Sequence, residues 1–203
     1  MFKNLFSNPS FLFLLAGNIY CIWYYQNNTG AFTTVVWIYW FQSITIGLFN
    51  FIDLLTITNF DSGDMKLNDQ PVTEGNKGCT AWFFLVHYGF FHLGYAIFIL
   101  KDFGVRSVNS TVLLLGVGTF FLEAIIGFIR QKQLERTVTF NIGSLFFLPY
   151  LRIVPMHLMI LLPAFLGWKP SIVFLALKMS ADILSFLLYH HVYSKNKIAG
   201  TVE

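Results

Sequence analysis

Six long apolar segments, separated by short polar turns, constrain the fold of this 203-residue chain more than any other feature. A transmembrane helix needs about 20 mostly apolar residues. Six stretches have that character: residues 9–25, 31–57, 79–100, 108–130, 144–167 and 170–192. Only 11% of the residues are charged, against about 25% in soluble domains. The sequence therefore predicts an all-α fold, a polytopic transmembrane helical bundle of six helices, with one membrane domain spanning residues 1–203.

The distribution of Lys and Arg among the loops predicts how the bundle is oriented, because positively charged loops stay in the cytoplasm. Eight such residues lie at the termini and in the 58–78 and 130–143 loops: Lys3, Lys66, Lys77, Arg130, Lys132, Arg136, Lys195 and Lys197. The remaining loops hold Lys101, Arg106 and Lys169. Both termini should therefore be cytoplasmic in a multi-pass cell-membrane protein. The bilayer is the expected partner, and basic residues scattered in this way give no nucleic-acid-binding patch.

Polar side chains of the six helices fall near one plane when depth is counted at about 1.5 Å per residue. They are Asn18, Gln42, Ser43, His87, His92, Glu123, Arg152, His157, Lys178 and Asp182. An ionised group at the bilayer centre costs about 2.5–3.5 kcal/mol, so such groups should face the bundle interior and be paired. Arg152 matches Glu123 in depth. Lys178 and Asp182 are four residues apart and share a helix face.

Local spacing adds detail to this polar layer. His87 and His92 are five residues apart, about 140° around a helix, so both can bind one metal ion only if the helix is distorted. Tyr88 and His92 share a face, so a hydrogen bond between them is expected. Asp53, His190 and His191 are placed near the cytoplasmic interface. Two helix features should also shape the bundle: prolines that break the hydrogen bonding of the fifth helix and glycines that admit a close neighbour to the third. These are Pro149, Pro155, Pro163, Gly89 and Gly94.

Four segments, YWFQSITIGLFN (39–50), HYGFFHLGYAIF (87–98), PYLRIVPMHLMIL (149–161) and LKMSADILSFLLYHH (177–191), carry a resemblance. In this order the chain resembles an uncharacterised family of prokaryotic integral membrane proteins, a domain of unknown function. The resemblance implies a prokaryotic inner or plasma membrane and attaches no activity. It also implies that six residues match polar positions of the family: His87, His92, Arg152, His157, Lys178 and Asp182. Gln42 stands where a glutamate is expected.

The first functional hypothesis is an intramembrane metal site, including a metal-assisted hydrolase of a membrane-delivered substrate. Imidazoles and a carboxylate suit a divalent metal such as zinc. The metal ligands would be His157, Asp182 and one of His87 or His92. Arg152 or Lys178 would stabilise developing negative charge in a catalytic role. The residues assigned to substrate binding are Gln42, Ser43, Tyr88 and Glu123.

Two other classes of function remain open, and so does the question of whether the chain is an enzyme. Midplane ionisable groups and a broken helix five are also typical of a transporter or channel for a proton, an ion or a small solute. Six helices are few for such a protein, and a homo-oligomer would meet that objection. The third class is a structural or ligand-binding membrane protein, in which the polar layer only holds the helices together.

Overall fold

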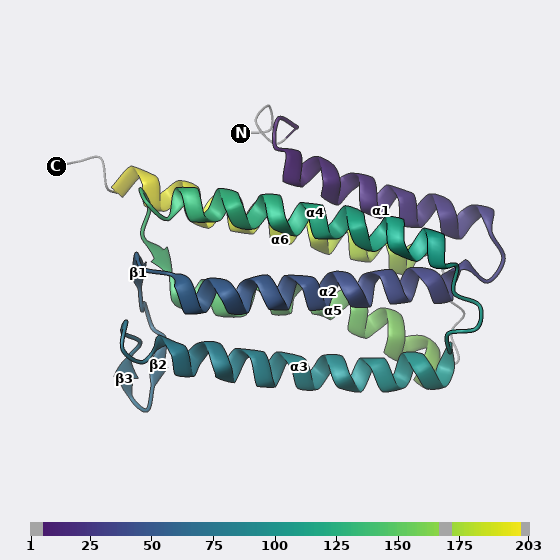
Figure 1. The fold of residues 1–203 in the computed structure, drawn as a ribbon, viewed down its shortest axis with the longest axis horizontal. Helices are drawn as coiled ribbons and strands as arrows, with labels where there is room; N and C mark the ends of the chain where they lie inside the picture. Colours follow the sequence, from purple (N-terminus) through teal and green to yellow (C-terminus); the bar gives the residue numbers. More distant parts are fainter. Residues whose placement is uncertain (1–5, 167–171, 200–203) are drawn as a thin grey trace.

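The computed structural model describes residues 6–166 and 172–199 and is all-α apart from four two-residue strands. The helices are α1 (Pro9–Asn27), α2 (Ala31–Thr56), α3 (Lys77–Asp102), α4 (Ser110–Leu134), α5 (Ile142–Leu166) and α6 (Ile172–Ala199). They agree with the six predicted segments to within four residues, except that α6 continues seven residues beyond its predicted end at residue 192. The predicted start of the sixth helix at Pro170 lies outside the described residues. The helices lie side by side, and α6 ends at the end of the bundle that carries the strands (Figure 1).

Local capping explains where several helices begin. Asn8 precedes Pro9, and its side-chain oxygen accepts a hydrogen bond from the Ser10 amide at 3.1 Å. Proline suits the first helical position because its missing N–H would have no partner there. Asn109 caps α4 in the same way through the Val112 amide. Each cap satisfies an amide that the helix itself cannot.

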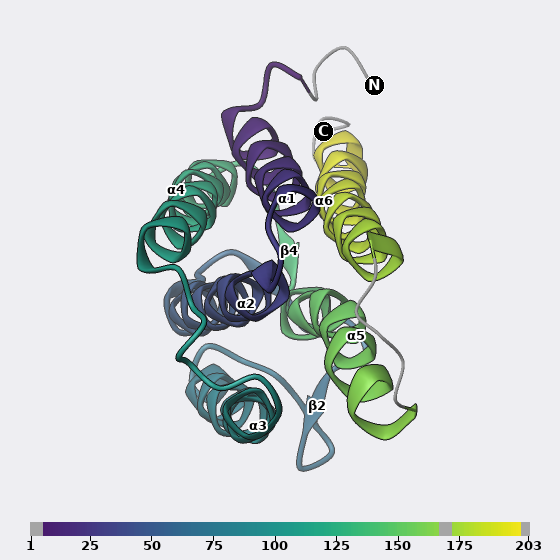
Figure 2. The same ribbon diagram turned by 90° about the vertical axis from the view of Figure 1, so that its right-hand side faces the viewer.

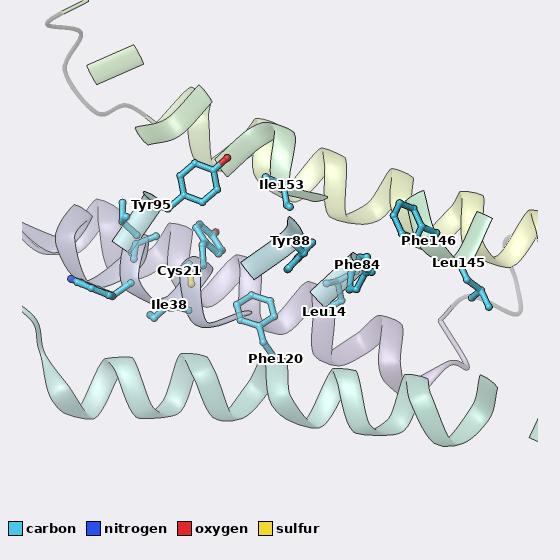
Figure 3. Close-up of a cluster of buried hydrophobic side chains, with 14 of the residues drawn as sticks. Leu14, Cys21, Ile38, Phe84, Tyr88, Tyr95, Phe120, Leu145, Phe146 and Ile153 are labelled. Carbon is cyan, nitrogen blue, oxygen red and sulfur yellow. The ribbon is translucent and has the colours of Figure 1, made fainter. Parts of the chain in front are cut away.

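Helix α2 is the centre of the bundle. Figure 2 shows it end-on, with α4 and α1 on one side, α3 on another and α5 beside it. Its buried side chains form a core with those of the surrounding helices, part of which Figure 3 shows around Ile38, Phe120 and Cys21. The second half of α5 turns away from α6 (Figure 2), as its prolines predict.

Glycines bring α2 close to its neighbours at two places. A Cβ on Gly47 would collide with the Tyr88 ring of α3, and a Cβ on Gly116 of α4 would lie 2.7–3.0 Å from Ile38. The expectation for Gly89 and Gly94 was wrong, because a Cβ at either position would meet open space. Gly89 is exposed and Gly94 is half-buried without a close neighbour, and α2 supplies the glycine for the close approach instead.

The polar loops at one end of the bundle contain short strands that the sequence did not predict. Strand β1 (Phe60–Asp61) pairs in parallel with β4 (Phe140–Asn141), which joins the α2–α3 loop to the α4–α5 loop. Strands β2 (Lys66–Leu67) and β3 (Gln70–Pro71) form a hairpin. Its two turn residues, Asn68 and Asp69, have φ values of 51° and 61°, the left-handed backbone that tight hairpin turns require.

The outer faces of the helices are strongly apolar. Phe90 of α3 is 73% exposed and Leu114 of α4 is 72% exposed. Soluble proteins rarely expose apolar side chains over large continuous surfaces. Three of the described helices, α2, α3 and α4, are long and apolar enough to cross a membrane. The chain is therefore a membrane protein.

Candidate functional site

Asp182 of α6 is the centre of a buried polar cluster. The carboxylate is fully buried and accepts hydrogen bonds from the Lys178 ammonium, which lies 2.6 Å from each oxygen. The amide nitrogens of Asn18 and Gln42 donate to Oδ2 from 3.1 and 3.2 Å. Lys178 also donates to the Gln42 side-chain oxygen at 2.9 Å and lies over the Tyr39 ring. Side chains of α1, α2 and α6 thus satisfy both charges of the pair.

Arg152 of α5 connects this cluster to Glu123 of α4. Its Nε lies 3.8 Å from Oδ1 of Asp182, and a terminal guanidinium nitrogen lies 3.5 Å from Oε1 of Glu123. The predicted pairings of Arg152 with Glu123 and of Lys178 with Asp182 are both present. The Arg152 contacts are long for ion pairs, however, so the cluster is tightly bonded around Lys178 and loosely bonded around Arg152.

A cavity of about 150 Å³ adjoins the loosely bonded side of the cluster. That is far more than the roughly 10–15 Å³ that one water needs. It extends from the middle of the bundle toward the end that carries the strands. The polar residues that line it are Ser10, Asn50, Asp53, Glu123, Gln131, Arg152 and Ser185.

Three residues of the cavity wall have buried polar atoms without a hydrogen-bond partner among the described residues. These atoms are Nδ2 of Asn50, Oε2 of Glu123 and Oγ of Ser185. A buried polar atom that makes no hydrogen bond costs about 1–3 kcal/mol. The three come from α2, α4 and α6 and gather around one space, so the cavity wall is suited to binding water or a small polar species.

A second group of charges lies at the end of the cavity nearest the strands. Asp53 is buried and forms an ion pair with Lys132 at 2.7 Å, and the Gln131 amide also contacts it. Lys132 reaches Glu135 as well, at 2.8 Å. Asp53 lies three residues before the end of α2, as predicted. Its side chain is buried rather than exposed at the interface, because α4 supplies both a cation and an amide donor.

Glu135 follows α4 and anchors the loop after α2. Its carboxylate accepts hydrogen bonds from the amide and the hydroxyl of Thr58, at 2.6 and 3.0 Å. Burial alone would raise the pKa of Glu135. The Lys132 ammonium and the two Thr58 hydrogen bonds outweigh burial and hold that pKa below its ordinary value.

Ser43, Tyr88 and His92 form a separate buried triad between α2 and α3. The Ser43 hydroxyl lies 2.8 Å from Nε2 of His92 and 3.1 Å from the Tyr88 hydroxyl. The Tyr88 hydroxyl donates to the Ser43 carbonyl at 2.9 Å, and Nδ1 of His92 lies 2.8 Å from the Tyr88 carbonyl. The expected hydrogen bond between Tyr88 and His92 is present, with the Tyr88 carbonyl rather than its hydroxyl as the partner, and both side chains also bond Ser43.

The other two predicted histidine ligands have separate partners. His157 is half-buried on α5 and its Nδ1 lies 2.7 Å from the Tyr95 hydroxyl. His87 is exposed on the outer face of α3 and bonds the Tyr150 hydroxyl at 2.8 Å. His190 and His191 have side chains outside the described part of the structure.

The predicted metal ligands are therefore spread over several clusters. Asp182 is bonded to Lys178 and two amides, His92 to Ser43, and His157 to Tyr95. Within the described ranges, no three His, Cys, Asp or Glu side chains lie together in an arrangement that could hold a metal ion. The intramembrane metal site remains a prediction that no contact of these residues favours.

Several residues of the cavity wall were not predicted, although helical spacing in the sequence could have identified them. On α2, Gln42 is followed at helical intervals by Ile46, Asn50 and Asp53. On α4, Gly127 and Gln131 follow Glu123 at intervals of four. Residues three or four apart share a helix face. Extending each helix face from its midplane residue toward the cytoplasmic end would have outlined the cavity.

The chain belongs to a family described as a family of unknown function (DUF6498), which it matches over residues 1–199. This agrees with the resemblance to an uncharacterised family. No curated protein and no solved structure matches the chain. The contacts of its own residues are therefore the basis for assigning a function.

Proposed function

We propose that this member of a family without an assigned activity is a transport protein that moves a proton, an ion or a small polar solute across the membrane. The observation that carries the proposal is the cavity beside Arg152 and Glu123. It leads from one end of the bundle to a buried ion-pair cluster, and three buried polar atoms in its wall lack partners. A wall with unpaired donors and acceptors gains free energy when a polar species enters.

The division of the cluster into two sides supports transport over a purely structural role. Lys178 and Asp182 satisfy each other with help from two amides, as groups that hold helices together should. Glu123 instead keeps one oxygen unpaired beside the cavity. An ionisable residue inside a membrane bundle marks a pathway for ions or substrate in most proteins that have one.

The transport proposal includes a topology. All six helices cross a prokaryotic cell membrane, and the end of the bundle with the strands, where α6 ends, faces the cytoplasm. The loops at that end carry eight of the eleven loop and terminal Lys and Arg residues, which favours this orientation. The cavity then opens toward the cytoplasm.

Flux measurements in proteoliposomes test the proposal. The purified chain is reconstituted, proton, Na⁺, K⁺ and Cl⁻ gradients are imposed in turn, and each is followed with a trapped dye that is sensitive to the ion under test. At least one gradient should dissipate faster than in protein-free vesicles, and Glu123→Gln should remove most of that difference. Asp102→Asn is the matched control, because Asp102 is an exposed acid at the end of α3. Equal fluxes in wild type, Glu123→Gln and empty vesicles for all four ions would refute transport of these species by this site.

The alternative of a metal-assisted hydrolase stands on the sequence alone. It requires Asp182 and His157 to approach a common ion, whereas the first is bonded to Lys178 and the second to Tyr95. Asp182 and His157 would both have to leave their present partners before they could bind one ion.

A further inference from the structure

The triad of Ser43, Tyr88 and His92 has a hydrogen-bond pattern that fixes most of its hydrogens. The three residues are almost completely buried. A backbone carbonyl only accepts, so Nδ1 of His92 must carry a hydrogen to bond the Tyr88 carbonyl. For the same reason the Tyr88 hydroxyl donates to the Ser43 carbonyl. In the neutral imidazole Nε2 then has no hydrogen and accepts one from the Ser43 hydroxyl.

The same triad accommodates one more proton without losing a hydrogen bond. When Nε2 of His92 is protonated, it donates to the Ser43 oxygen instead of accepting from it. The Ser43 hydroxyl hydrogen turns away and donates to the Tyr88 oxygen, which is already 3.1 Å distant. One N–H bond forms at Nε2 as an O–H bond of the incoming hydronium ion breaks and leaves water. One hydroxyl rotates, and no other covalent bond of the triad changes. Release of the proton reverses both events.

The backbone holds this geometry in place. Ser43 and Gly47 are four apart on α2, and Tyr88 and His92 are four apart on α3, so the two pairs meet across one helix contact. Gly47 admits the Tyr88 ring, which lies 4.3 Å from the His92 ring in a stacked arrangement. The Trp40 indole donates to the His92 carbonyl at 3.0 Å.

We propose that Ser43, Tyr88 and His92 form a proton-accepting site, and that the proton is the species that this protein carries or couples to. This inference rests on the proposed transport function and names its substrate. The proton arrives at Nε2 of His92, and Ser43 and Tyr88 are positioning residues that keep the hydrogen-bond pattern complete in both protonation states.

The position of the triad relative to the cavity supports this assignment. On α3, Tyr95 lies beyond His92 in the direction away from the strands. On α5, His157 lies beyond Arg152 in that direction, by about 7.5 Å at 1.5 Å per residue. The Tyr95–His157 pair is half-buried and its tyrosine ring is in edge contact with His92. The cavity thus lies in the half of the bundle nearest the strands. The Tyr95 hydroxyl and the His157 imidazole lie in the other half.

Few titratable or charged groups lie around His92. Tyr88 and Tyr95 of its own helix and His157 of α5 lie near its ring. Tyr150 and Arg152 of α5 face its partner Tyr88. Helix α2 contributes the neutral Ser43 and Trp40. No carboxylate is hydrogen-bonded to His92 in the part of the chain that the structure describes. A buried imidazolium in such surroundings is costly, which suits a group that holds a proton only in passage.

Imidazole nitrogen NMR of the full chain in lipid nanodiscs tests the site directly. The His92 signals are assigned by their loss in His92→Gln, and the spectrum is recorded from about pH 4 to pH 9. Nδ1 should stay protonated throughout, while Nε2 gains a proton reversibly as the pH falls. Ser43→Ala should reduce the protonated population at a given pH about tenfold, because a charge-assisted bond is lost. Ser43→Thr keeps the hydroxyl, so its protonated His92 population should match that of the wild type.

Either of two NMR results would overturn the proposal. One is a His92 that stays in a single neutral form over the whole range. The other is a titration that Ser43→Ala leaves unchanged in a variant whose size-exclusion profile and thermal unfolding match the wild type.

Proton flux in proteoliposomes separates this inference from the function on which it rests. His92→Gln should abolish proton flux, and Lys101→Gln, an exposed change on the same helix, should leave it intact. If Glu123→Gln abolishes flux of any ion while His92→Gln leaves proton flux unchanged, transport stands and the proton site is refuted. If neither variant differs from wild type in any flux, both proposals fail.

Discussion

The Lys178–Asp182 pair offers the sharpest test of how charges are held in the bundle. Asp182 is 0% exposed and Lys178 is 2% exposed. Lys178→Met leaves a buried carboxylate with two amide donors and an Arg152 nitrogen 3.8 Å away. Removing one partner of a buried ion pair costs about 3–5 kcal/mol. Asp182→Leu leaves the ammonium with the Gln42 oxygen and should destabilise by a similar amount.

The double variant should be less destabilised than the two single changes together. It removes both charges and leaves mainly the Asn18 and Gln42 amides without their acceptor, a cost of about 1–3 kcal/mol for each amide. The two single changes together cost about 6–10 kcal/mol, so central values of about 8 and about 4 kcal/mol give a coupling free energy of about 4 kcal/mol. Reversible unfolding in mixed micelles, followed by circular dichroism across the four-member cycle, measures this coupling.

A matched cycle on the outer face of α6 provides the control. Ser180 and Leu184 have the same spacing and are exposed, so Ser180→Ala and Leu184→Ala should add within about 0.5 kcal/mol. Should the Lys178 and Asp182 changes also prove additive, the two charges do not depend on each other. The central cluster described above would then be the wrong account of the core.

Two further predictions concern the end of the bundle with the strands. Glu135 has a lowered folded-state pKa, so it contributes stability above its unfolded-state pKa and this contribution is lost as the pH falls through the folded-state pKa. Below about pH 5, wild type should lose stability more steeply than Glu135→Gln, and parallel profiles would contradict this. Cys79 is exposed near that end and Ser107 is exposed near the other. In whole cells a membrane-impermeant maleimide should label Ser107→Cys and should reach Cys79 only after lysis, and the reverse pattern would overturn the proposed orientation.

Ion pairs could be predicted from the sequence where they depend only on depth in the membrane or on spacing along one helix. Depth along the membrane normal matched Arg152 to Glu123, and a spacing of four matched Lys178 to Asp182. The apolar lengths likewise located the helices, because a chain in lipid must satisfy its backbone within each helix.

Contacts that depend on the rotation of one helix against another could not be predicted. Counting residues gives the depth of His92 and leaves open which neighbour it faces. Gly47 opposite Tyr88 sets that rotation and brings His92 to Ser43, a relation between two helices that neither segment reveals alone. The strands were missed for another reason: two-residue strands are too short to show the alternation by which strands are recognised.

The backbone pairing of Phe60 with Phe140 and of Asp61 with Asn141 also bears on movement. This pairing joins the α2–α3 loop to the α4–α5 loop by backbone hydrogen bonds. The ends of α2, α3, α4 and α5 near the strands are therefore held together. At the opposite end, side chains of α2 bond the α3–α4 loop instead: the Trp37 indole donates to the Gly104 carbonyl at 2.9 Å, and the Thr34 hydroxyl accepts from the Asn109 amide at 3.1 Å. A rearrangement that admits cargo from the far side is therefore expected to break these two side-chain bonds and to leave the backbone pairing near the strands intact.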